Sequence, residues 1–128
     1  MVVLDTHTWV WWLVRPALLG RRARELIRAE DEIGVAAISA WELGMLRQRG
    51  RIELDRPLGQ WVRHALARPG VSEIPLTASI ALAAGTLPED FPRDPADRLI
   101  YATARAQGAT LVTKDARMRE FDPAGTVW

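Results

Sequence analysis

The segment Val2-Val3-Leu4-Asp5 decides the fold class, because it is an apolar run that ends abruptly in an acid. A run this short and this rich in β-branched residues is typical of a strand that is buried on both faces. A second run of this kind, Leu111-Val112-Thr113, lies near the other end of the chain and is followed by Asp115. Between them, helical patterns alternate with short apolar runs, which predicts a parallel sheet covered by helices.

Working outward from the first run, apolar periodicity, glycines and prolines divide the chain into strands and helices. We expect strands at residues 2–5, 33–37, 71–76, 110–113 and 126–128. We expect helices at residues 8–14, 20–32, 39–49, 57–68, 78–87, 96–107 and 116–120, with a proline- and acid-rich loop at 88–95. The predicted fold class is α/β, in a single domain that comprises residues 1–128.

Composition restricts the chemistry that this chain can perform. It contains no cysteine, which excludes disulfides, thiolate zinc sites and cysteine nucleophiles. It contains two histidines, His7 and His64, which are too few for a histidine-rich zinc or copper cluster. Neither a phosphate-binding loop ending in lysine nor a Gly-x-Ser-x-Gly elbow is present. A metal site would have to be built from oxygen ligands, which favour magnesium or manganese.

Charge and hydropathy say less about partners. The formal net charge is +1, and all 17 cationic side chains except Lys114 are arginines, which suit phosphate or carboxylate without identifying either. The arginines at 15–28 and 47–56 are equally typical of solvated helix faces. The apolar run Trp9–Val14 is too short to span a bilayer, and no basic segment precedes it as in a signal peptide. We therefore expect a cytoplasmic protein that does not bind membranes.

Four acids, Asp5, Glu42, Asp97 and Asp115, stand beside apolar runs, where an unpaired carboxylate is costly. Asp5 and Asp115 follow predicted strands, whereas Glu42 and Asp97 fall in the first turns of predicted helices. In a parallel sheet these positions can face one edge, the edge at which ligands bind. Four carboxylates at one place would repel one another and raise their own pKa values unless a cation lay among them. The arrangement therefore predicts a divalent-metal site.

The helix-start acids also have structural interpretations. Ser39 and Glu42 have the spacing of a capping box, and Glu42 considered alone is better explained by capping than by metal binding. Asp94 precedes a proline at a predicted helix start, and we interpret it as the N-cap. Asp97 would suit the dipole of the same helix, although a metal ligand can occupy that position too.

The strand-end acids are harder to explain structurally. Asp5 could cap the first helix, although either of two nearby threonines could do so. Asp115 could be a cap as well, and the lysine before it could neutralise its charge. His7 could be a base or a ligand, but a histidine at a helix start usually only forms hydrogen bonds. The metal-site hypothesis therefore depends on the four acids together.

Six tryptophans are many for a chain of this length. Trp9 and Trp12 are one helical turn apart, and Trp11 points elsewhere, so one helix cannot bury all three on a narrow face. We expect one or two of them in the core and the others in an exposed patch that binds a protein partner.

Several short motifs follow one another in a fixed order over essentially the whole chain. They are Val3-Leu4-Asp5-Thr6-His7, Ser39-Ala40-Trp41-Glu42-Leu43, Ile74-Pro75-Leu76-Thr77, Leu87-Pro88, Asp94-Pro95-Ala96-Asp97-Arg98-Leu99-Ile100 and Leu111-Val112-Thr113-Lys114-Asp115. Each motif is weak alone, but together they resemble those of PIN-domain ribonucleases, specifically the toxin members of VapBC-type toxin–antitoxin pairs. One residue departs from the closest subgroup, because Ala96 stands where that subgroup has phenylalanine; the change affects packing rather than a ligand.

This resemblance implies a PIN-like three-layer α/β/α domain with a mainly parallel sheet of about five strands. It implies that the four acids bind Mg²⁺ or Mn²⁺, with Asp94 as a candidate auxiliary acid, and that Thr113 lies beside the metal and orients a water molecule. The implied reaction is hydrolysis of an RNA phosphodiester bond. The implied partners are an RNA substrate, a cognate antitoxin that inhibits the enzyme, and a second copy of the chain in a homodimer.

Two other classes of function stay open at the level of sequence. A Mg²⁺-dependent phosphotransfer protein also places aspartates at strand ends. However, a dehalogenase-like enzyme expects a second aspartate where His7 stands, and a receiver expects one where Ile33–Ala37 leads into Ile38-Ser39. A non-catalytic PIN-like module that only binds RNA or protein is the other alternative, against which the four intact acids argue.

Overall fold

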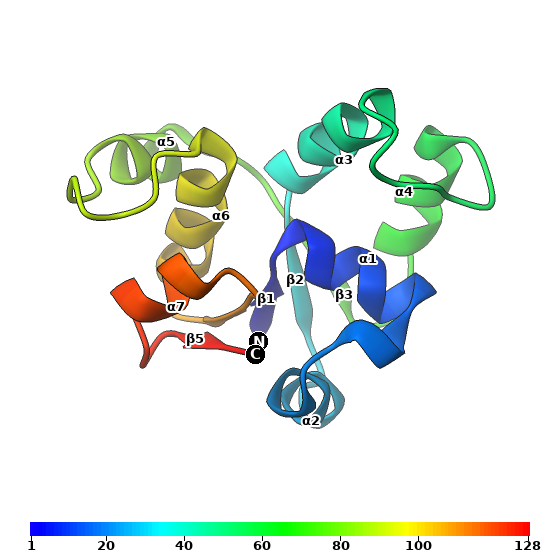
Figure 1. Ribbon diagram of the computed structural model, residues 1–128, viewed down its shortest axis with the longest axis horizontal. Coiled ribbons are helices and arrows are strands. Elements are labelled where there is room, and N and C mark those ends of the chain that lie inside the picture. The colour runs from blue at the N-terminus through cyan, green and yellow to red at the C-terminus, as the bar shows by residue number, and fades with distance from the viewer.

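The apolar runs form the strands of one five-stranded sheet. A computed structural model describes residues 1–128, and its strand order is β3-β2-β1-β4-β5, with every neighbouring pair parallel (Figure 1). The central strands are buried on both faces, which explains why their sequences are continuously apolar. The strands are β1 (Val2–Leu4), β2 (Ile33–Ala36), β3 (Val71–Ile74), β4 (Thr110–Val112) and β5 (Thr126–Val127).

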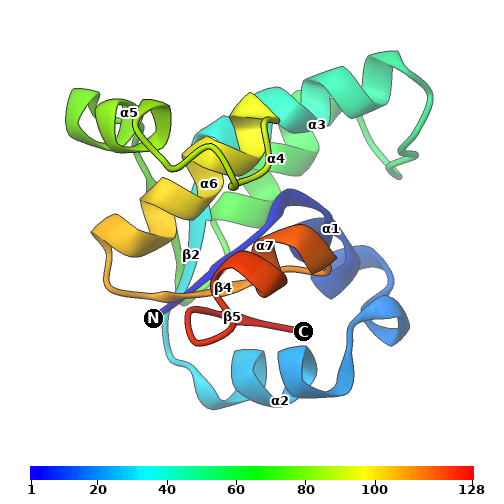
Figure 2. The ribbon, with the colours of Figure 1, turned by 60° about the vertical axis from the view of Figure 1, so that its left-hand side comes forward.

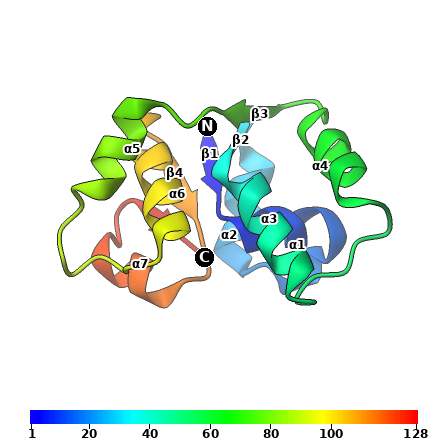
Figure 3. The ribbon, with the colours of Figure 1, turned by 90° about the horizontal axis from the view of Figure 1, so that it is seen from above.

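Helices cover the two faces of this sheet in separate groups (Figures 2 and 3). One group is α1 (Thr6–Val14), the 3₁₀ turn η1 (Pro16–Leu18), α2 (Arg21–Ala29), α3 (Ile38–Gln48) and α4 (Leu58–Leu66). The other is α5 (Ala78–Gly85), α6 (Pro95–Ala106) and α7 (Ala116–Phe121). The predicted three-layer α/β/α fold with a parallel sheet of five strands is therefore confirmed.

Two apolar clusters hold the layers together, one on each face of the sheet. Alternate residues of β1 divide between them, because successive side chains of a strand point to opposite faces. Val2 and Leu4 pack with Trp9 of α1 and Trp61 of α4, whereas Val3 packs with residues of α6 and α7. The fully buried Trp9 confirms that one tryptophan of the first helix belongs to the core.

The order of the strands fixes where a ligand can bind. The chain moves from β1 to β2 and β3 on one side, and then returns to β4 and β5 on the other side of β1. The strand order therefore reverses between β1 and β4, and sheets of this kind bind ligands just beyond the carboxyl ends of the strands at that point. Asp5 follows β1, and Thr113 follows β4.

No helix is both long enough and apolar enough to cross a lipid bilayer.

Candidate active site

Asp5 and Thr113 meet where the strand order reverses. Leu4 of β1 is in register with Val112 of β4, and the amide of Asp5 donates to the carbonyl oxygen of Val112 at 3.0 Å. This pairing brings the next residues of the two strands side by side. The Thr113 hydroxyl, which is fully buried, donates to Oδ2 of Asp5 at 2.7 Å. A side chain near the end of the sequence thus fixes the orientation of an acid at its beginning.

Asp5 is buried and its carboxylate is held from both sides. The Thr6 amide donates to Oδ1 at 2.8 Å, so Asp5 is the N-cap of α1, which begins at Thr6 rather than at Thr8 as predicted. Burial raises the pKa of the Asp5 carboxyl group, although the hydrogen bonds from Thr113 and Thr6 oppose the shift. No cationic side chain forms an ion pair with it.

Glu42 is not part of a capping box, so that prediction is wrong. The helix α3 begins at Ile38, one residue before the expected cap, and no side chain caps it. Ser39 lies inside the first turn, fully buried, and its hydroxyl accepts a hydrogen bond from Thr6 Oγ1 at 3.0 Å. Glu42 therefore has no capping role, and it lines the same pocket as Asp5. Burial, in the first place, raises the pKa of its carboxyl group.

Asp94 and Asp97 begin the helix α6 in the roles that sequence suggested. Asp94 Oδ1 accepts a hydrogen bond from the Asp97 amide at 3.1 Å, so Asp94 is the N-cap. Each of Glu42, Asp94 and Asp97 offers a carboxylate oxygen, and these oxygens lie within 4.8 Å of one another. Asp94 is exposed and does not line the pocket described below, so it stands at the outer edge of the cluster.

Arg98 is a residue whose role sequence analysis missed. Its guanidinium group donates to main-chain carbonyl oxygens between Ala84 and Pro92, the shortest bond being 3.0 Å to Pro92. These bonds hold the loop that leads into α6, and they occupy the guanidinium group of Arg98 with carbonyl oxygens of that loop. Arg98 therefore supports the position of Asp97 instead of neutralising its charge.

Asp115 serves as a cap and as a member of the cluster at the same time. Its Oδ1 accepts hydrogen bonds from the amides of Arg117 and Met118, both at 2.9 Å, at the start of α7. Its own amide donates to Thr113 Oγ1 at 3.0 Å, so one hydroxyl links the two strand-end acids. Oδ2 receives no hydrogen bond from the protein, which leaves it free to bind a ligand.

The predicted acids converge on one pocket of about 530 Å³. All four acids of the predicted quartet line the pocket, and Thr113, which does not line it, is hydrogen-bonded to Asp5. His7, which sequence left open, is exposed on its wall. Two lining residues, Trp11 and Lys114, were not predicted to be there. The lining residues are Asp5, His7, Trp11, Glu42, Asp97, Lys114 and Asp115.

Comparison with known proteins identifies the family to which this fold and this acidic pocket belong. The sequence model of the PIN-domain family matches residues 2–123, which is nearly the whole chain. This chain belongs to the PIN-domain family. Along 118 residues it is 45% identical to Ribonuclease VapC22 of Mycobacterium tuberculosis, with 92% of this chain and 89% of that protein covered.

Solved structures with little sequence similarity share the same fold. A toxin–antitoxin complex from Klebsiella pneumoniae contains a chain that superposes with a TM-score of 0.70 at 20% identity, covering 100% of this chain and 97% of that one. VapBC2 from Rickettsia felis, bound to a DNA fragment from its promoter, gives a TM-score of 0.70 at 17% identity, with coverage of 99% and 98%. Membership of the PIN family removes the dehalogenase-like and receiver-like alternatives.

The donor set of this PIN domain suits a divalent cation. Burial raises the pKa of Asp97 to about 8, and the carboxylates of Asp5, Asp94, Asp115 and Glu42 add to the shift. Repulsion among acids that no arginine neutralises is the condition that a bound cation relieves. Because the donors are all carboxylate oxygens, with no sulfur and one exposed imidazole at the wall, they match a hard cation such as Mg²⁺ or Mn²⁺.

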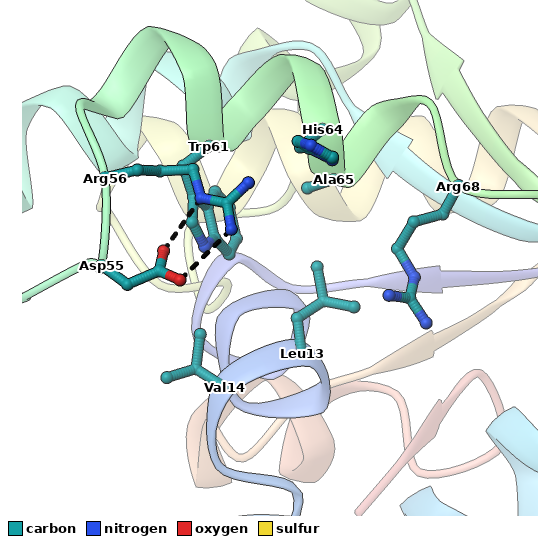
Figure 4. A pocket seen from close by; sticks show the side chains of 8 residues that line it. All are labelled: Leu13, Val14, Asp55, Arg56, Trp61, His64, Ala65 and Arg68. Atoms are coloured by element: carbon teal, nitrogen blue, oxygen red, sulfur yellow. Dashed lines mark hydrogen bonds and ion pairs between the residues drawn. The ribbon is translucent and has the colours of Figure 1, made fainter.

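A second cavity, of about 400 Å³, lies between α1 and α4 and has a different chemistry (Figure 4). Its floor includes Leu13 and Val14, and Arg68 reaches in from the far end of α4. Its one acid, Asp55, is already paired with Arg56 at 3.0 Å. This cavity therefore has no free carboxylate for a cation, and the acidic pocket is the better candidate for the active site.

Proposed function

We propose that this PIN domain is a metal-dependent endoribonuclease of the VapC toxin type, with its active site in the acidic pocket. One observation carries the proposal: four carboxylates without a cationic partner converge where the strand order reverses. The similarity to a protein named as a ribonuclease supports RNA as the substrate. The whole of residues 1–128 would act as one nuclease domain.

The roles of the acids follow from their surroundings. Asp5, Asp97 and Asp115 would hold the ion directly, because each keeps at least one oxygen with spare lone pairs toward the pocket. Asp115 would bind through Oδ2, since its Oδ1 is occupied by two amides. A bound Mg²⁺ or Mn²⁺ would polarise the scissile phosphate and lower the pKa of the attacking water.

Glu42 and Thr113 would complete the site in different ways. Burial raises the pKa of Glu42, so its carboxylate can accept a proton from water more readily than a solvated glutamate. Glu42 would therefore be a further ligand or the base. Thr113 would act by position, because its hydroxyl holds Asp5 and the Asp115 amide at 2.7 and 3.0 Å.

A toxic ribonuclease requires an inhibitor, and the structural relatives include toxin–antitoxin complexes. We place the antitoxin against the outer side of α1. The space between α1 and α2 is largely filled, because Ala23 and Ile27 of α2 belong to the core. A cavity of about 200 Å³ remains beside Trp12, and the larger cavity of Figure 4 lies on the α4 side of the same helix. Both would accept apolar side chains of an amphipathic segment.

A homodimer is the remaining partner proposal. Leu82 on α5 has 70% of its surface exposed, and a mostly apolar cavity of about 320 Å³ lies between α5 and α6, so the two helices present an apolar face. A second copy of the chain would cover that face.

The proposal is tested by incubating labelled RNA with the purified protein in Mn²⁺ and in EDTA. Cleavage in Mn²⁺ that EDTA abolishes is the expected result. Asp5→Asn should fold and lose this cleavage, since it keeps the shape of the side chain but removes a charge from the cluster. Cleavage by Asp5→Asn at the wild-type rate would show that the chemistry lies elsewhere. A wild-type protein that binds RNA without cutting it would support the non-catalytic alternative.

A further inference from the structure

Lys114 is the only lysine among the 17 cationic side chains, and it lines the acidic pocket. It is exposed and forms no ion pair with any of the acids beside it. The sequence suggested that Lys114 neutralises Asp115, but Asp115 Oδ1 is instead bonded to the two amides at the start of α7. The ammonium group of Lys114 therefore has no ion-pair partner in the folded protein.

The position of Lys114 is set by an aromatic ring. Its Nζ lies over the ring of Trp11, 5.4 Å from the centroid, a distance at which an ammonium group is attracted by the π-system. Trp11 is itself held in place, because its ring lies 5.5 Å from His7 and 5.8 Å from Trp128. Trp128 in turn packs so closely against Gly20 that a Cβ at Gly20 would lie 2.7 Å from the Trp128 carbonyl carbon.

This geometry addresses a difficulty that the acidic pocket poses for its substrate. An RNA backbone carries a phosphate at every nucleotide, and phosphates next to the scissile bond would be repelled by Glu42 and Asp94 at the mouth of the pocket. Lys114 can offset this repulsion, because it has no ion-pair partner and the ring of Trp11 holds it at the wall of the pocket. A compact ammonium group with three donors suits a single phosphate oxygen, whereas the planar arginine fork suits bidentate pairing.

We propose that Lys114 binds a phosphate of the RNA backbone at the mouth of the acidic pocket, and that Trp11 is the positioning residue that holds it there. The proposal rests on the proposed ribonuclease function. It assigns to Trp11 a role in substrate binding, in place of the partner-binding patch that sequence suggested for the tryptophans outside the core. It also explains why a half-buried tryptophan lines a pocket that is otherwise polar.

Salt dependence gives the most direct test. Binding of a fluorescently labelled, single-stranded RNA of twelve uridines is measured in EDTA, which stops metal-dependent cleavage, over a range of KCl concentrations. Each phosphate contact to a single strand contributes about 0.7 to the slope of log K against log salt. Lys114→Met should lower the slope by about 0.7 and weaken binding about tenfold at low salt. Lys114→Arg should keep the slope, because it keeps the charge.

A matched control comes from the opposite edge of the sheet. Arg28 is an exposed cation in the last turn of α2, just before the amino end of β2. Arg28→Met removes the same charge from the protein as Lys114→Met but should leave the slope unchanged. A similar loss of slope in both variants would contradict the proposal, because it would show that Lys114 affects RNA binding only through the net charge of the protein.

The role of Trp11 is tested with a double-mutant cycle. Trp11→Leu should weaken RNA binding and raise KM more than it lowers kcat, while Trp11→Phe, which keeps a ring, should retain most of the binding. Combining Trp11→Leu with Lys114→Met should add little to Lys114→Met alone, because the ring acts through the lysine. Fully additive effects would contradict the positioning role of Trp11.

The two proposals fail in different ways. If wild-type protein neither binds nor cuts RNA, the ribonuclease function falls and the role of Lys114 falls with it. If wild-type protein cuts RNA but Lys114→Met shows an unchanged slope, only the role of Lys114 is wrong. In that case Lys114 would act on the acids alone, and its removal would tighten Mn²⁺ binding without changing RNA binding in EDTA.

Discussion

At the scale of single residues, Asp97 carries a marked electrostatic conflict. Burial raises the pKa of its carboxyl group from 3.8 to about 8, and neighbouring carboxylates, Asp5 first among them, add to the shift. Between these two pH values the folded, metal-free protein keeps a proton that the unfolded chain releases. Stability must therefore fall as the pH rises through this range. The charged form of Asp97, which would bind a cation, is the form that the empty pocket disfavours.

Thermal unfolding in EDTA between pH 4 and pH 8 tests this linkage. The melting temperature of the wild type should fall across that range, and Asp97→Asn should flatten the fall because its amide does not titrate. Asp97→Asn should also be the more stable protein above pH 8. The same pH dependence in both proteins would mean that Asp97 is solvated like an ordinary aspartate.

Thr113 is the second residue with a testable energetic role. Thr113→Val keeps the shape of the side chain but removes the hydroxyl that bonds Asp5 Oδ2 and the Asp115 amide. Leaving such buried groups unpaired should cost about 1–3 kcal/mol in the free energy of unfolding, measured with urea. Thr113→Ser keeps the hydroxyl and is the matched control. Equal losses in both variants would show that the loss does not come from the hydroxyl, because Thr113→Ser retains it.

At the scale of elements, the junctions between strands and helices place the site. Sequence predicted the strands well, because buried parallel strands read as continuous apolar runs. It predicted the starts of α1 and α3 less well. Local patterns cannot show that Asp5 caps α1, nor that Ser39 turns inward to bond Thr6. That bond joins residues 33 positions apart, so it depends on β1 and β2 being neighbours.

Two substitutions of Asp115 can separate its capping role in α7 from its proposed role in the active site. Asp115→Asn keeps an oxygen that can accept from the Arg117 and Met118 amides, so it should preserve the cap of α7 and stability. Asp115→Ala removes the cap and should cost about 1 kcal/mol. Both variants should lose most RNA cleavage in Mn²⁺. Normal cleavage by Asp115→Asn would leave Asp115 with the capping role only.

At the scale of the whole molecule, the tryptophans show what sequence could not supply. Periodicity correctly indicated that one helix cannot bury Trp9, Trp11 and Trp12 together. It could not show that Trp11 faces the acidic pocket, since that depends on Trp128 returning beside it from the end of the chain. The acids were found from sequence because their positions follow from the topology of a parallel sheet. The pocket's tryptophan and lysine had no such pattern.

Trp12 remains the candidate for antitoxin binding. It is half-buried, stacks with Arg68 at 5.5 Å and lines the cavity beside α2. Trp12→Ala should weaken binding of the proposed cognate antitoxin by at least about tenfold, since aromatic anchors dominate such interfaces. RNA cleavage should change little. Leu76→Ala, which removes an exposed apolar side chain just beyond β3, is the control, and calorimetric titration gives both affinities. Normal binding by Trp12→Ala would move the interface elsewhere.

The most direct test of the central claim is a calorimetric titration of Mn²⁺ into the wild type and into four variants. The variants are Asp5→Asn, Glu42→Gln, Asp97→Asn and Asp115→Asn. The control is Asp31→Asn, because Asp31 is a solvent-exposed acid outside the pocket. If the acids form one cation site, the wild type and the control bind Mn²⁺ with equal affinity. Asp5→Asn and Asp97→Asn should bind it at least about tenfold more weakly. Equal affinity in all six proteins would show that the carboxylates do not share a metal ion.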